Sequence, residues 1–388
     1  MIFAYLKNRY EVRRPTALIY LGLIDCFWWA LENLCHLKAP PIPSIKRNVL
    51  TSKKILLVNG AHLGDLVIST AAIKRIKEAN PEIQIGFLAG SWGSELLKNH
   101  PGIDYFYPVS HWRINRSAVS TLSKVILYWQ QWWTAYRAIR KEQYDVALLL
   151  NSFFPNFASL LWLSRCKLTA GYVSAVGGPL LTLCLPKPKN SEQAIQLALL
   201  DAVNIRGVSS GWVEVDSSLL SKRIKDQLPP AFILLHPGTG NTAKEWPVER
   251  WITLGQILRN EGHSIVLTGH GESESNLCKK IAAQINGIDL SNQIKLNDWI
   301  FIIQKSRLVI GVDSAAGHIA SALQKPFVGI YSGIGEVSRW TPAGSRVTVL
   351  THPMPCSPCH TRPCKDRPCL LNIGPIDVLA ITNLLLAK

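Results

Sequence analysis

The stretch VIGVDSAAGHIASAL, residues 309–323, decides the fold of this chain. Its apolar, β-branched run stops at Asp313, and small residues with helical spacing follow at once. A strand that leads through a tight loop into a helix is the repeating unit of open α/β sheets. The unpaired N–H groups and the positive dipole end of the new helix favour an anion such as phosphate. We therefore expect Asp313, Ser314 and His318 to lie at an anion site.

A simpler interpretation of these residues remains open. In it, Asp313 and Ser314 only cap the helix, and His318 is a buried histidine with hydrogen bonds of its own. Two further glycine-rich loops favour the anion site, because glycine lets the backbone approach a ligand without a Cβ contact. They are NGAHLGD at residues 59–65 and HPGTGNTAK at residues 236–244, and each follows an apolar run.

Both loops end in a charged residue. Asp65 stands at a predicted helix start, where an aspartate either caps the helix or accepts a proton from a substrate hydroxyl. A carboxyl group with a pKa near ~4 is ionised at neutral pH. Lys244 is either the counter-charge of a phosphate or a solvated lysine.

The chain of 388 residues is too long for one ordinary core, so two α/β domains are expected. We expect a basic, aromatic helix and a proline-rich linker at 1–50, a Rossmann-like domain at 51–205 and another at 206–388. Strands and helices that alternate twice over predict two doubly wound sheets facing each other across a cleft, with ligand at the carboxyl ends of the strands. The predicted strands are 53–59, 83–90, 103–109, 144–150, 231–236, 263–269, 307–313 and 326–333.

The formal net charge is +16, from 42 Lys and Arg against 26 Asp and Glu. Such a balance suggests nucleic acid, an anionic membrane or a phosphorylated substrate as partner. Basic residues stand beside aromatic ones at the N-terminus and along residues 112–141. The latter segment fits an interfacial membrane helix or, equally, a solvated basic face with tryptophan turned into the core. The residues concerned are Lys7, Arg9, Arg13, Arg14, Phe27, Trp28 and Trp29, and then Trp112, Arg113, Arg116, Lys124, Trp129, Trp132, Trp133, Arg137, Arg140 and Lys141.

The apolar segment at residues 17–31 contains Asp25 and is shorter than the ~20 residues that span a bilayer. It has no small-residue cleavage pattern, so a secretory signal is not expected. The predicted location is the cytoplasm, peripheral on the inner face of a membrane.

Nine cysteines fall into two groups. Cys26, Cys35, Cys166, Cys184 and Cys278 are scattered in apolar or helical segments and are interpreted as buried thiols. Cys356, Cys359, Cys364 and Cys369 stand close together, with His360 between them. They are a candidate zinc set, although the spacing is not that of a common zinc module. Reduced or oxidised thiols are the alternative.

Several chemistries lose support because their motifs are missing. The sequence contains no P-loop GKS or GKT and no HExxH. No recognised nucleic-acid motif accompanies the positive charge, so no nucleic-acid partner is expected.

Taken together, three segments resemble glycosyltransferase family 9, the bacterial heptosyltransferases. GAHLGDLVISTAAIKRIKEANPEIQIGFLAG resembles that family's opening, and HPGTGNTAKEWPVERW resembles the start of its second domain. SRLVIGVDSAAGHIASALQKPFVGIYSGIGEVSRWTP resembles its D-[ST]-G-x-x-H signature and later W-x-P element, and the cysteine-bearing tail is similar to that of many members. The match runs from about residue 53 to the C-terminus.

The resemblance implies a GT-B fold and inverting transfer of a sugar, usually from ADP-heptose, to a lipopolysaccharide-core acceptor. It implies that Asp65 is the catalytic base and that Lys244 contacts the diphosphate. The other implied donor-binding residues are Thr239, Gly240, Asp313, Ser314, Ala315, Gly317 and His318, and the implied acceptor loop contains Gly60, His62 and Gly64. No metal or other cofactor is required if Lys244 and helix dipoles stabilise the departing diphosphate.

The chain also departs from the family pattern. Ala315 replaces the usual glycine after Asp-Ser, and the N-terminal 50 residues and the tryptophan-rich segment lie outside the usual core. Alternatives are therefore another nucleotide sugar used for another cell-surface glycan, and a non-catalytic module that binds a nucleotide sugar or glycolipid. The expected partners are an ADP-sugar, a glycolipid acceptor and an anionic membrane surface.

Overall fold

The computed structural model describes residues 15–34, 52–153, 157–172, 174, 177–359, 364 and 366–387. The chain divides into two compact units, Met1–Ser209 and Ser210–Lys388. The predicted N-terminal basic residues, Cys35, His360 and the proline-rich linker lie outside the described residues, as do the side chains of Trp28 and Trp29.

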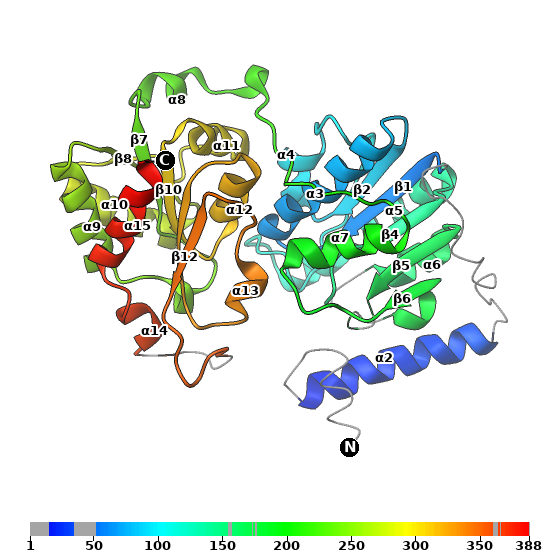
Figure 1. Ribbon diagram of the computed structural model, residues 1–388. Coiled ribbons are helices and arrows are strands. Elements are labelled where there is room, and N and C mark those ends of the chain that lie inside the picture. Colours follow the sequence, from blue (N-terminus) through cyan, green and yellow to red (C-terminus); the bar gives the residue numbers. More distant parts are fainter. Residues whose placement is uncertain are drawn as a thin grey trace. The chain divides into compact units, whose positions relative to one another are not determined.

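The first unit is built on a six-stranded parallel sheet with helices on both faces (Figure 1). Its strand order is β3-β2-β1-β4-β5-β6. The strands are β1 Lys54–Asn59, β2 Gln84–Ala89, β3 Tyr105–Pro108, β4 Val146–Leu149, β5 Leu168–Tyr172 and β6 Leu183–Leu185. The helices are α2 Pro15–Leu34, α3 Leu63–Ala79, α4 Ser94–Leu97, α5 Thr121–Glu142, α6 Ala158–Ser164 and α7 Glu192–Ala202, with 3-10 turns η2 Ser91–Gly93 and η3 Gly178–Leu180.

The second unit repeats this topology, with strand order β12-β11-β10-β7-β8-β9. Its strands are β7 Phe232–His236, β8 Ser264–Leu267, β9 Ile288–Asp289, β10 Leu308–Val312, β11 Phe327–Tyr331 and β12 Val347–Thr351. Its helices are α8 Lys222–Gln227, α9 Val248–Asn260, α10 Glu272–Ile285, α11 Leu296–Lys305, α12 Ala315–Ala322, α13 Val337–Trp340, α14 Pro368–Leu371 and α15 Pro375–Leu386. The 3-10 turns are η4 Ser217–Leu219 and η5 Thr242–Lys244.

Both sheets have the strand order of a doubly wound fold, so the prediction of two such sheets is confirmed. In this fold the order reverses between the first and fourth strands, and ligands bind beyond the carboxyl ends of the strands at that switch point. In the first unit the switch point lies between β1 and β4, and in the second between β7 and β10. The loops after β1, β7 and β10 are those that the sequence singled out.

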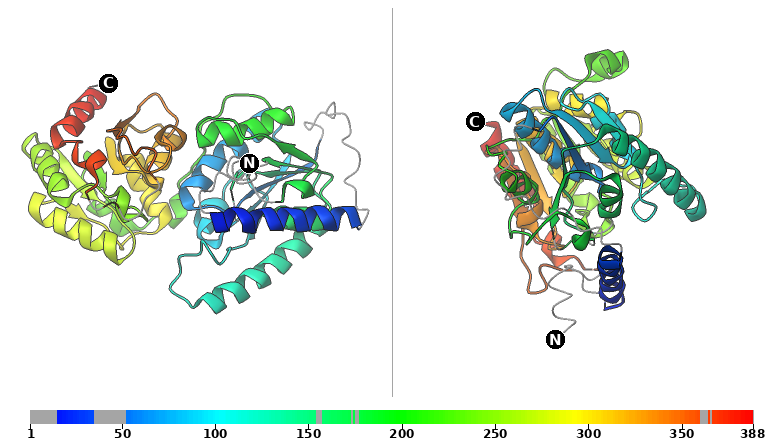
Figure 2. Two further views of the ribbon diagram at one scale, coloured as in Figure 1. Left: turned by 90° about the horizontal axis from the view of Figure 1, so that it is seen from below. Right: turned by 90° about the vertical axis from the view of Figure 1, so that its right-hand side faces the viewer.

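A polar contact holds α2 to the first unit. Asp25 is buried and accepts a hydrogen bond from the Gly177 backbone N–H, 2.6 Å away. Among the described helices, none is long and apolar enough to cross a membrane. Figure 2 shows both α2 and α5 on the outside of the first unit.

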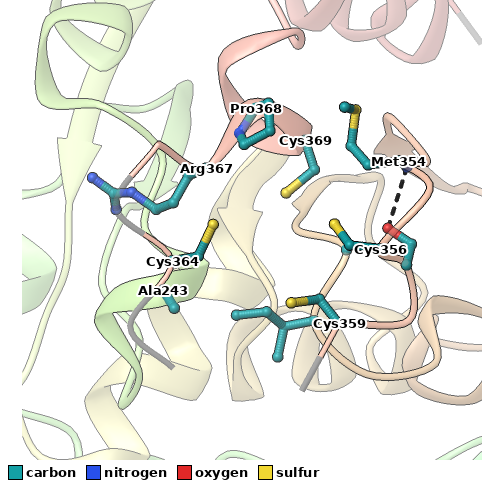
Figure 3. Close-up of a pocket in the computed structure, with 11 residues that line it drawn as sticks. Ala243, Met354, Cys356, Cys359, Cys364, Arg367, Pro368 and Cys369 are labelled. Carbon is teal, nitrogen blue, oxygen red and sulfur yellow. Dashed lines mark hydrogen bonds between the residues drawn. The ribbon is translucent and has the colours of Figure 1, made fainter. Parts of the chain in front are cut away.

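The scattered cysteines correct one expectation, because only Cys278 of those described is buried. Cys166 and Cys184 are half-buried, and Cys26 is exposed because its position on α2 faces away from the unit. The four C-terminal cysteines instead line one pocket, beside Arg367 and Met354 (Figure 3).

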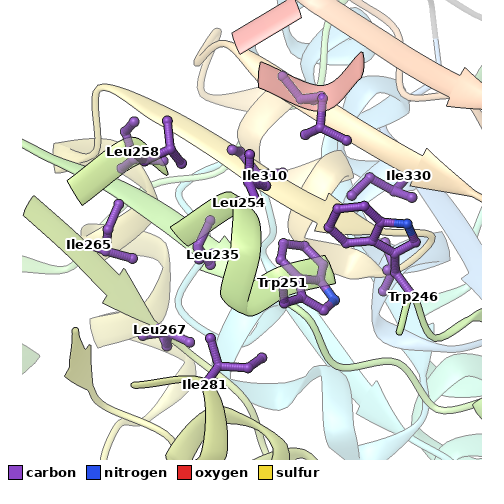
Figure 4. Close-up of a cluster of buried hydrophobic side chains, with 14 of the residues drawn as sticks. Leu235, Trp246, Trp251, Leu254, Leu258, Ile265, Leu267, Ile281, Ile310 and Ile330 are labelled. Carbon is purple, nitrogen blue, oxygen red and sulfur yellow. The ribbon is translucent and has the colours of Figure 1, made fainter. Parts of the chain in front are cut away.

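The core of the second unit fixes the loop that carries Lys244. Trp246 and Trp251 are buried edge to face, with ring centroids 5.1 Å apart, and lie in the cluster that contains Leu254 and Ile330 (Figure 4). The Trp246 Nε1–H donates to the Ile373 carbonyl at 3.0 Å. Burial of these two tryptophan side chains stabilises the folded state by roughly 2–3 kcal/mol each. The end of the loop next to Trp246 is therefore held in place.

Close packing explains Gly317, the third residue of α12. A Cβ at this position would lie 2.7 Å from the ring of Phe327, which is fully buried, and 3.1 Å from Pro342. We expect Gly317→Ala to lower the free energy of unfolding by about 1–3 kcal/mol, because overpacking outweighs the higher helix propensity of alanine. Urea unfolding measures this change. Adding Phe327→Leu should recover part of the loss, whereas a Gly317→Ala protein at least as stable as the wild type would contradict the packing.

Candidate functional site

The loops after β7 and β10 come together at the switch point of the second sheet. Gly311 on β10 is paired in register with His236 at the end of β7, so the two loops leave the sheet side by side. The Lys244 ammonium forms an ion pair with the Asp313 carboxylate. The Thr239 hydroxyl donates to the Asp313 carbonyl at 3.2 Å. Three predicted donor-site residues, from two loops far apart in sequence, therefore form one cluster.

The start of α12 lies beside this ion pair. Ser314 occupies the N-cap position, but its side chain makes no capping hydrogen bond, and Lys244 engages the Asp313 carboxylate. The simpler interpretation, that both residues only cap the helix, is therefore wrong for Ser314. The Ser314 Oγ is buried and has no hydrogen-bond partner among the described residues. Ala315 begins the helix and is half-buried.

His318 and Tyr331 lie below the cluster, inside the unit. Burial lowers the pKa of His318 to about 4, opposed by the charge of Asp313 and assisted by that of Lys244. Burial raises the pKa of Tyr331 well above 10, and the negative charge of Asp313 adds to the shift. The Tyr331 hydroxyl is buried without a hydrogen-bond partner among the described residues. His318 is thus a neutral histidine at physiological pH, and Tyr331 is a neutral polar group that the sequence analysis missed.

The depressed pKa of His318 predicts a pH dependence of stability. Since the folded-state pKa is about 4 and the unfolded value about 6.5, the unfolded chain binds the extra proton between these values. The free energy of unfolding should therefore fall as pH drops from 6.5 to 4, with a His318 contribution on the order of 3 kcal/mol. His318→Gln should make urea-derived stability less steeply dependent on pH in this window. A slope identical to that of the wild type would contradict the neutral, buried imidazole.

The glycines of the second loop differ in their surroundings. A Cβ on Gly238 would collide with the Glu274 side chain at 2.4 Å, whereas Gly240 is exposed. The Glu274 carboxylate accepts a hydrogen bond from the His270 backbone N–H at 2.9 Å. The absence of a side chain at Gly238 therefore leaves room for the Glu274 side chain. The predicted roles of Gly240 and Gly317 in donor binding stay predictions.

In the first unit, Asp65 is the third residue of α3 and is only 8% exposed. A buried polar network lies beneath it. The Ser69 hydroxyl and the Asn59 side-chain amide donate to the Asp65 carbonyl at 3.0 and 3.4 Å. The Ser69 Oγ also contacts Asn59 Nδ2 and Gln196 Oε1, both at 2.8 Å. These three residues escaped the sequence analysis, since Gln196 arrives from α7, a distant part of the chain.

The remaining residues of the first loop surround the start of α3. His62 is the N-cap residue and is exposed, with its ring centroid 6.4 Å from that of Trp92. Partial desolvation, and then the charge of Arg116, lowers the pKa of His62. A Cβ on Gly60 would lie 2.4 Å from the ring of Phe157, so Gly60 has a packing reason of its own. Gly64, the second residue of α3, is half-buried.

The structure describes all four clustered cysteines but not His360. Within the described ranges, no group of three or more His, Cys, Asp or Glu side chains is arranged to hold a metal ion. Cys356, Cys359, Cys364 and Cys369 line the same pocket, but their side chains are not arranged as the ligands of a metal ion.

Comparisons with known proteins point to one family. Residues 132–370 match the family model described as glycosyltransferase family 9 (heptosyltransferase). Lipopolysaccharide heptosyltransferase 1 of Pseudomonas aeruginosa is 22% identical over 331 residues, which cover 79% of this chain and 86% of that protein. Lipopolysaccharide heptosyltransferase 2 of Salmonella typhimurium is 24% identical over 305 residues, covering 72% and 82%.

Solved structures share the fold. The structure of E. coli ADP-heptose lps heptosyltransferase II has a TM-score of 0.69 at 19% identity, covering 86% of this chain and 98% of its own. E. coli heptosyltransferase WaaC with ADP-2-deoxy-2-fluoro heptose has a TM-score of 0.64 at 15% identity, covering 85% and 99%. The two parallel sheets and these neighbours confirm the expected GT-B fold.

Proposed function

Because this chain belongs to glycosyltransferase family 9 and is a glycosyltransferase, we propose that it transfers heptose from ADP-heptose to a lipopolysaccharide-core-type acceptor with inversion. The observation that carries this proposal is the cluster at the switch point of the second sheet. There the Lys244 ammonium, the unbonded Ser314 hydroxyl and the start of α12 adjoin one another. A cation and free N–H groups at a helix N-terminus suit the diphosphate of a nucleotide sugar.

We propose that Asp65 accepts the proton of the acceptor hydroxyl. The hydroxyl oxygen then forms a bond to the anomeric carbon while the bond from that carbon to the diphosphate oxygen breaks. ADP leaves with the bonding electron pair, and its developing charge is stabilised by Lys244 and the α12 N–H groups. In this scheme the chain's own groups do the work for which other enzymes use a metal ion, so no metal cofactor is needed. The four clustered cysteines are proposed to have no part in transfer.

The ion pair between Lys244 and Asp313 refines these roles. A diphosphate beside Lys244 would also face the Asp313 carboxylate, and like charges repel. We therefore propose that Asp313 positions the Lys244 ammonium and accepts hydrogen bonds from donor hydroxyl groups, rather than binding the diphosphate itself. The Ser314 hydroxyl, which has no partner among the described residues, is suited to a phosphate oxygen, whereas the Thr239 hydroxyl would first have to leave the Asp313 carbonyl.

One observation favours a different donor sugar. Ala315 starts α12 where the family pattern has glycine, so this chain carries a methyl group at the helix start that glycine lacks. The second candidate function is therefore transfer from another nucleotide sugar to another cell-surface glycan. In both cases we propose a cytoplasmic enzyme on the inner face of a membrane, where a glycolipid acceptor is exposed.

A ligand screen by thermal unfolding tests the donor. ADP-, UDP-, GDP- and CMP-sugars are compared, each with and without EDTA. We expect ADP-heptose to raise the midpoint of unfolding, because a ligand at about 100 times its Kd adds about 2.7 kcal/mol. Chelation should leave this shift unchanged. Stabilisation by a UDP-, GDP- or CMP-sugar alone would reject the ADP donor, and a shift abolished by EDTA would reject metal independence.

A further inference from the structure

Helix α5 has two different apolar stripes. Tyr128, Trp132, Ala135 and Ile139 are buried and belong to the core of the first unit. Leu122, Ile126, Trp129 and Trp133, here called the α5 stripe, recur at the same spacing of four, three and four residues. Leu122 is 70% exposed and the other three are 50–52% exposed. The second stripe is therefore not needed to fill this core.

The α5 stripe lies in a purely basic segment. No acidic residue occurs between Asp104 and Glu142. The basic residues in that interval are Arg113, Arg116, Lys124, Arg137, Arg140 and Lys141, and all but Lys124, which is half-buried, are exposed. The Arg113 guanidinium lies 5.8 Å from the Trp112 ring centroid, and that of Arg140 lies 6.0 Å from the Tyr136 ring centroid. Positive charge and exposed aromatic rings are thus interleaved.

This combination decides between the possible occupants of the surface. A protein partner or a second copy of this chain would have to supply many carboxylates to match six basic residues, and this chain is itself strongly basic. An anionic bilayer supplies negative charge at its surface and an apolar layer directly beneath it. Tryptophan prefers that boundary, and Lys and Arg near the surface are attracted by anionic headgroups.

We propose that the α5 stripe and its flanking basic residues form the face by which this protein docks onto an anionic lipid bilayer. The helix lies in the interface plane, with the four stripe side chains among the upper acyl chains and the arginines at the headgroups. Figure 2 shows α5 along the outside of its unit. This proposal rests on the membrane location given in the proposed function and assigns the surface that makes the contact. Binding to the membrane does not itself depend on the transfer reaction.

The test is sedimentation of the full-length protein with vesicles of phosphatidylcholine, with or without phosphatidylglycerol. Two variants, Trp129→Gln/Trp133→Gln and Leu122→Gln/Ile126→Gln, remove different halves of the stripe. The second pair guards against misfolding, since Trp129 and Trp133 also contact the rings of Trp132 and Tyr136. Ile376→Gln/Leu384→Gln is the matched control, because both residues are at least half exposed on α15 of the other unit.

We expect wild type and control to bind phosphatidylglycerol vesicles, and each stripe variant to bind at least about tenfold more weakly. Arg116→Gln/Arg137→Gln should weaken binding by about 30-fold at low salt, at ~1 kcal/mol per charge. Brominated lipids should quench the tryptophan fluorescence of wild type but that of Trp129→Gln/Trp133→Gln less. Asp65→Asn should bind vesicles as the wild type does, because Asp65 is not part of the α5 stripe. The vesicle result is therefore independent of whether the proposed transfer mechanism is right.

Three outcomes would overturn the proposal. Unchanged vesicle binding by both stripe variants would move the membrane contact to another surface, such as the exposed Leu23 and Phe27 side chains of α2. Equal binding to phosphatidylcholine alone would remove the electrostatic part. A wild-type dimer that ignores vesicles, and that the stripe variants convert to monomer, would assign the stripe to self-association.

Discussion

Asp65→Asn should reduce the rate of sugar transfer by a factor on the order of 10²–10⁴, which is the usual contribution of a general base. An amide cannot accept the proton of the acceptor hydroxyl. The buried network of Ser69 and Asn59 should survive the change, because these two side chains bond to the Asp65 carbonyl. Steady-state rates give the loss in kcat, and calorimetry with ADP-heptose should show nearly unchanged donor affinity.

The matched control is Glu82→Gln, which makes the same carboxylate-to-amide change at an exposed position of the same unit. It should transfer sugar at the wild-type rate. If Asp65→Asn retains turnover, Asp65 is not the base. If it loses donor affinity and turnover together, its role is binding rather than proton transfer.

The second large effect is expected at Lys244. Replacement by methionine removes the positive charge opposite the departing diphosphate, and loss of one such group costs about 10²–10³ in kcat. Donor affinity should also fall by about tenfold to a hundredfold, because a hydrogen bond to a charged group contributes about 1.5–3 kcal/mol. Titration with ADP gives the affinity, and initial rates give the loss in turnover.

The ion pair adds a test of mechanism. In Lys244→Met the Asp313 carboxylate remains and repels the diphosphate, so Lys244→Met/Asp313→Asn should bind ADP more tightly than Lys244→Met alone. Lys305→Met, which removes an exposed lysine of α11, is the control and should be neutral. Wild-type ADP affinity in Lys244→Met would contradict a diphosphate contact.

Most of the fold could be predicted because its central strands are buried on both faces. Such strands appear as unbroken apolar runs, and all eight predicted strands are present as β1, β2, β3, β4, β7, β8, β10 and β11. The four missed strands have weaker signals. β9 has two residues, β5 is interrupted by Gly171, and the edge strands β6 and β12 are only partly buried.

The charged residues of the two candidate regions could be picked out from the sequence, since Lys244, Asp65 and Asp313 each follow closely after an apolar strand. Their partners could not. The ion pair between Lys244 and Asp313 depends on β7 and β10 being neighbours, and the contact between Ser69 and Gln196 joins α3 to α7. Nothing in the sequence indicates that Tyr331 lies near the Asp313 loop, because a tyrosine at the end of an apolar strand is most simply interpreted as a core residue. The tryptophan-rich helix has Trp132 in the core and Trp129 and Trp133 exposed, so its tryptophans are not all turned into the core. The interpretation as an interfacial membrane helix stays a prediction.

The most direct test of the account is a transfer assay with ADP-heptose and a lipopolysaccharide-core acceptor that lacks the added heptose. We predict release of one ADP for each heptose added to the acceptor, with the anomeric configuration of the product inverted relative to that of the donor. No transfer under conditions in which ADP-heptose demonstrably binds would contradict the account, as would a product that retains the donor's configuration.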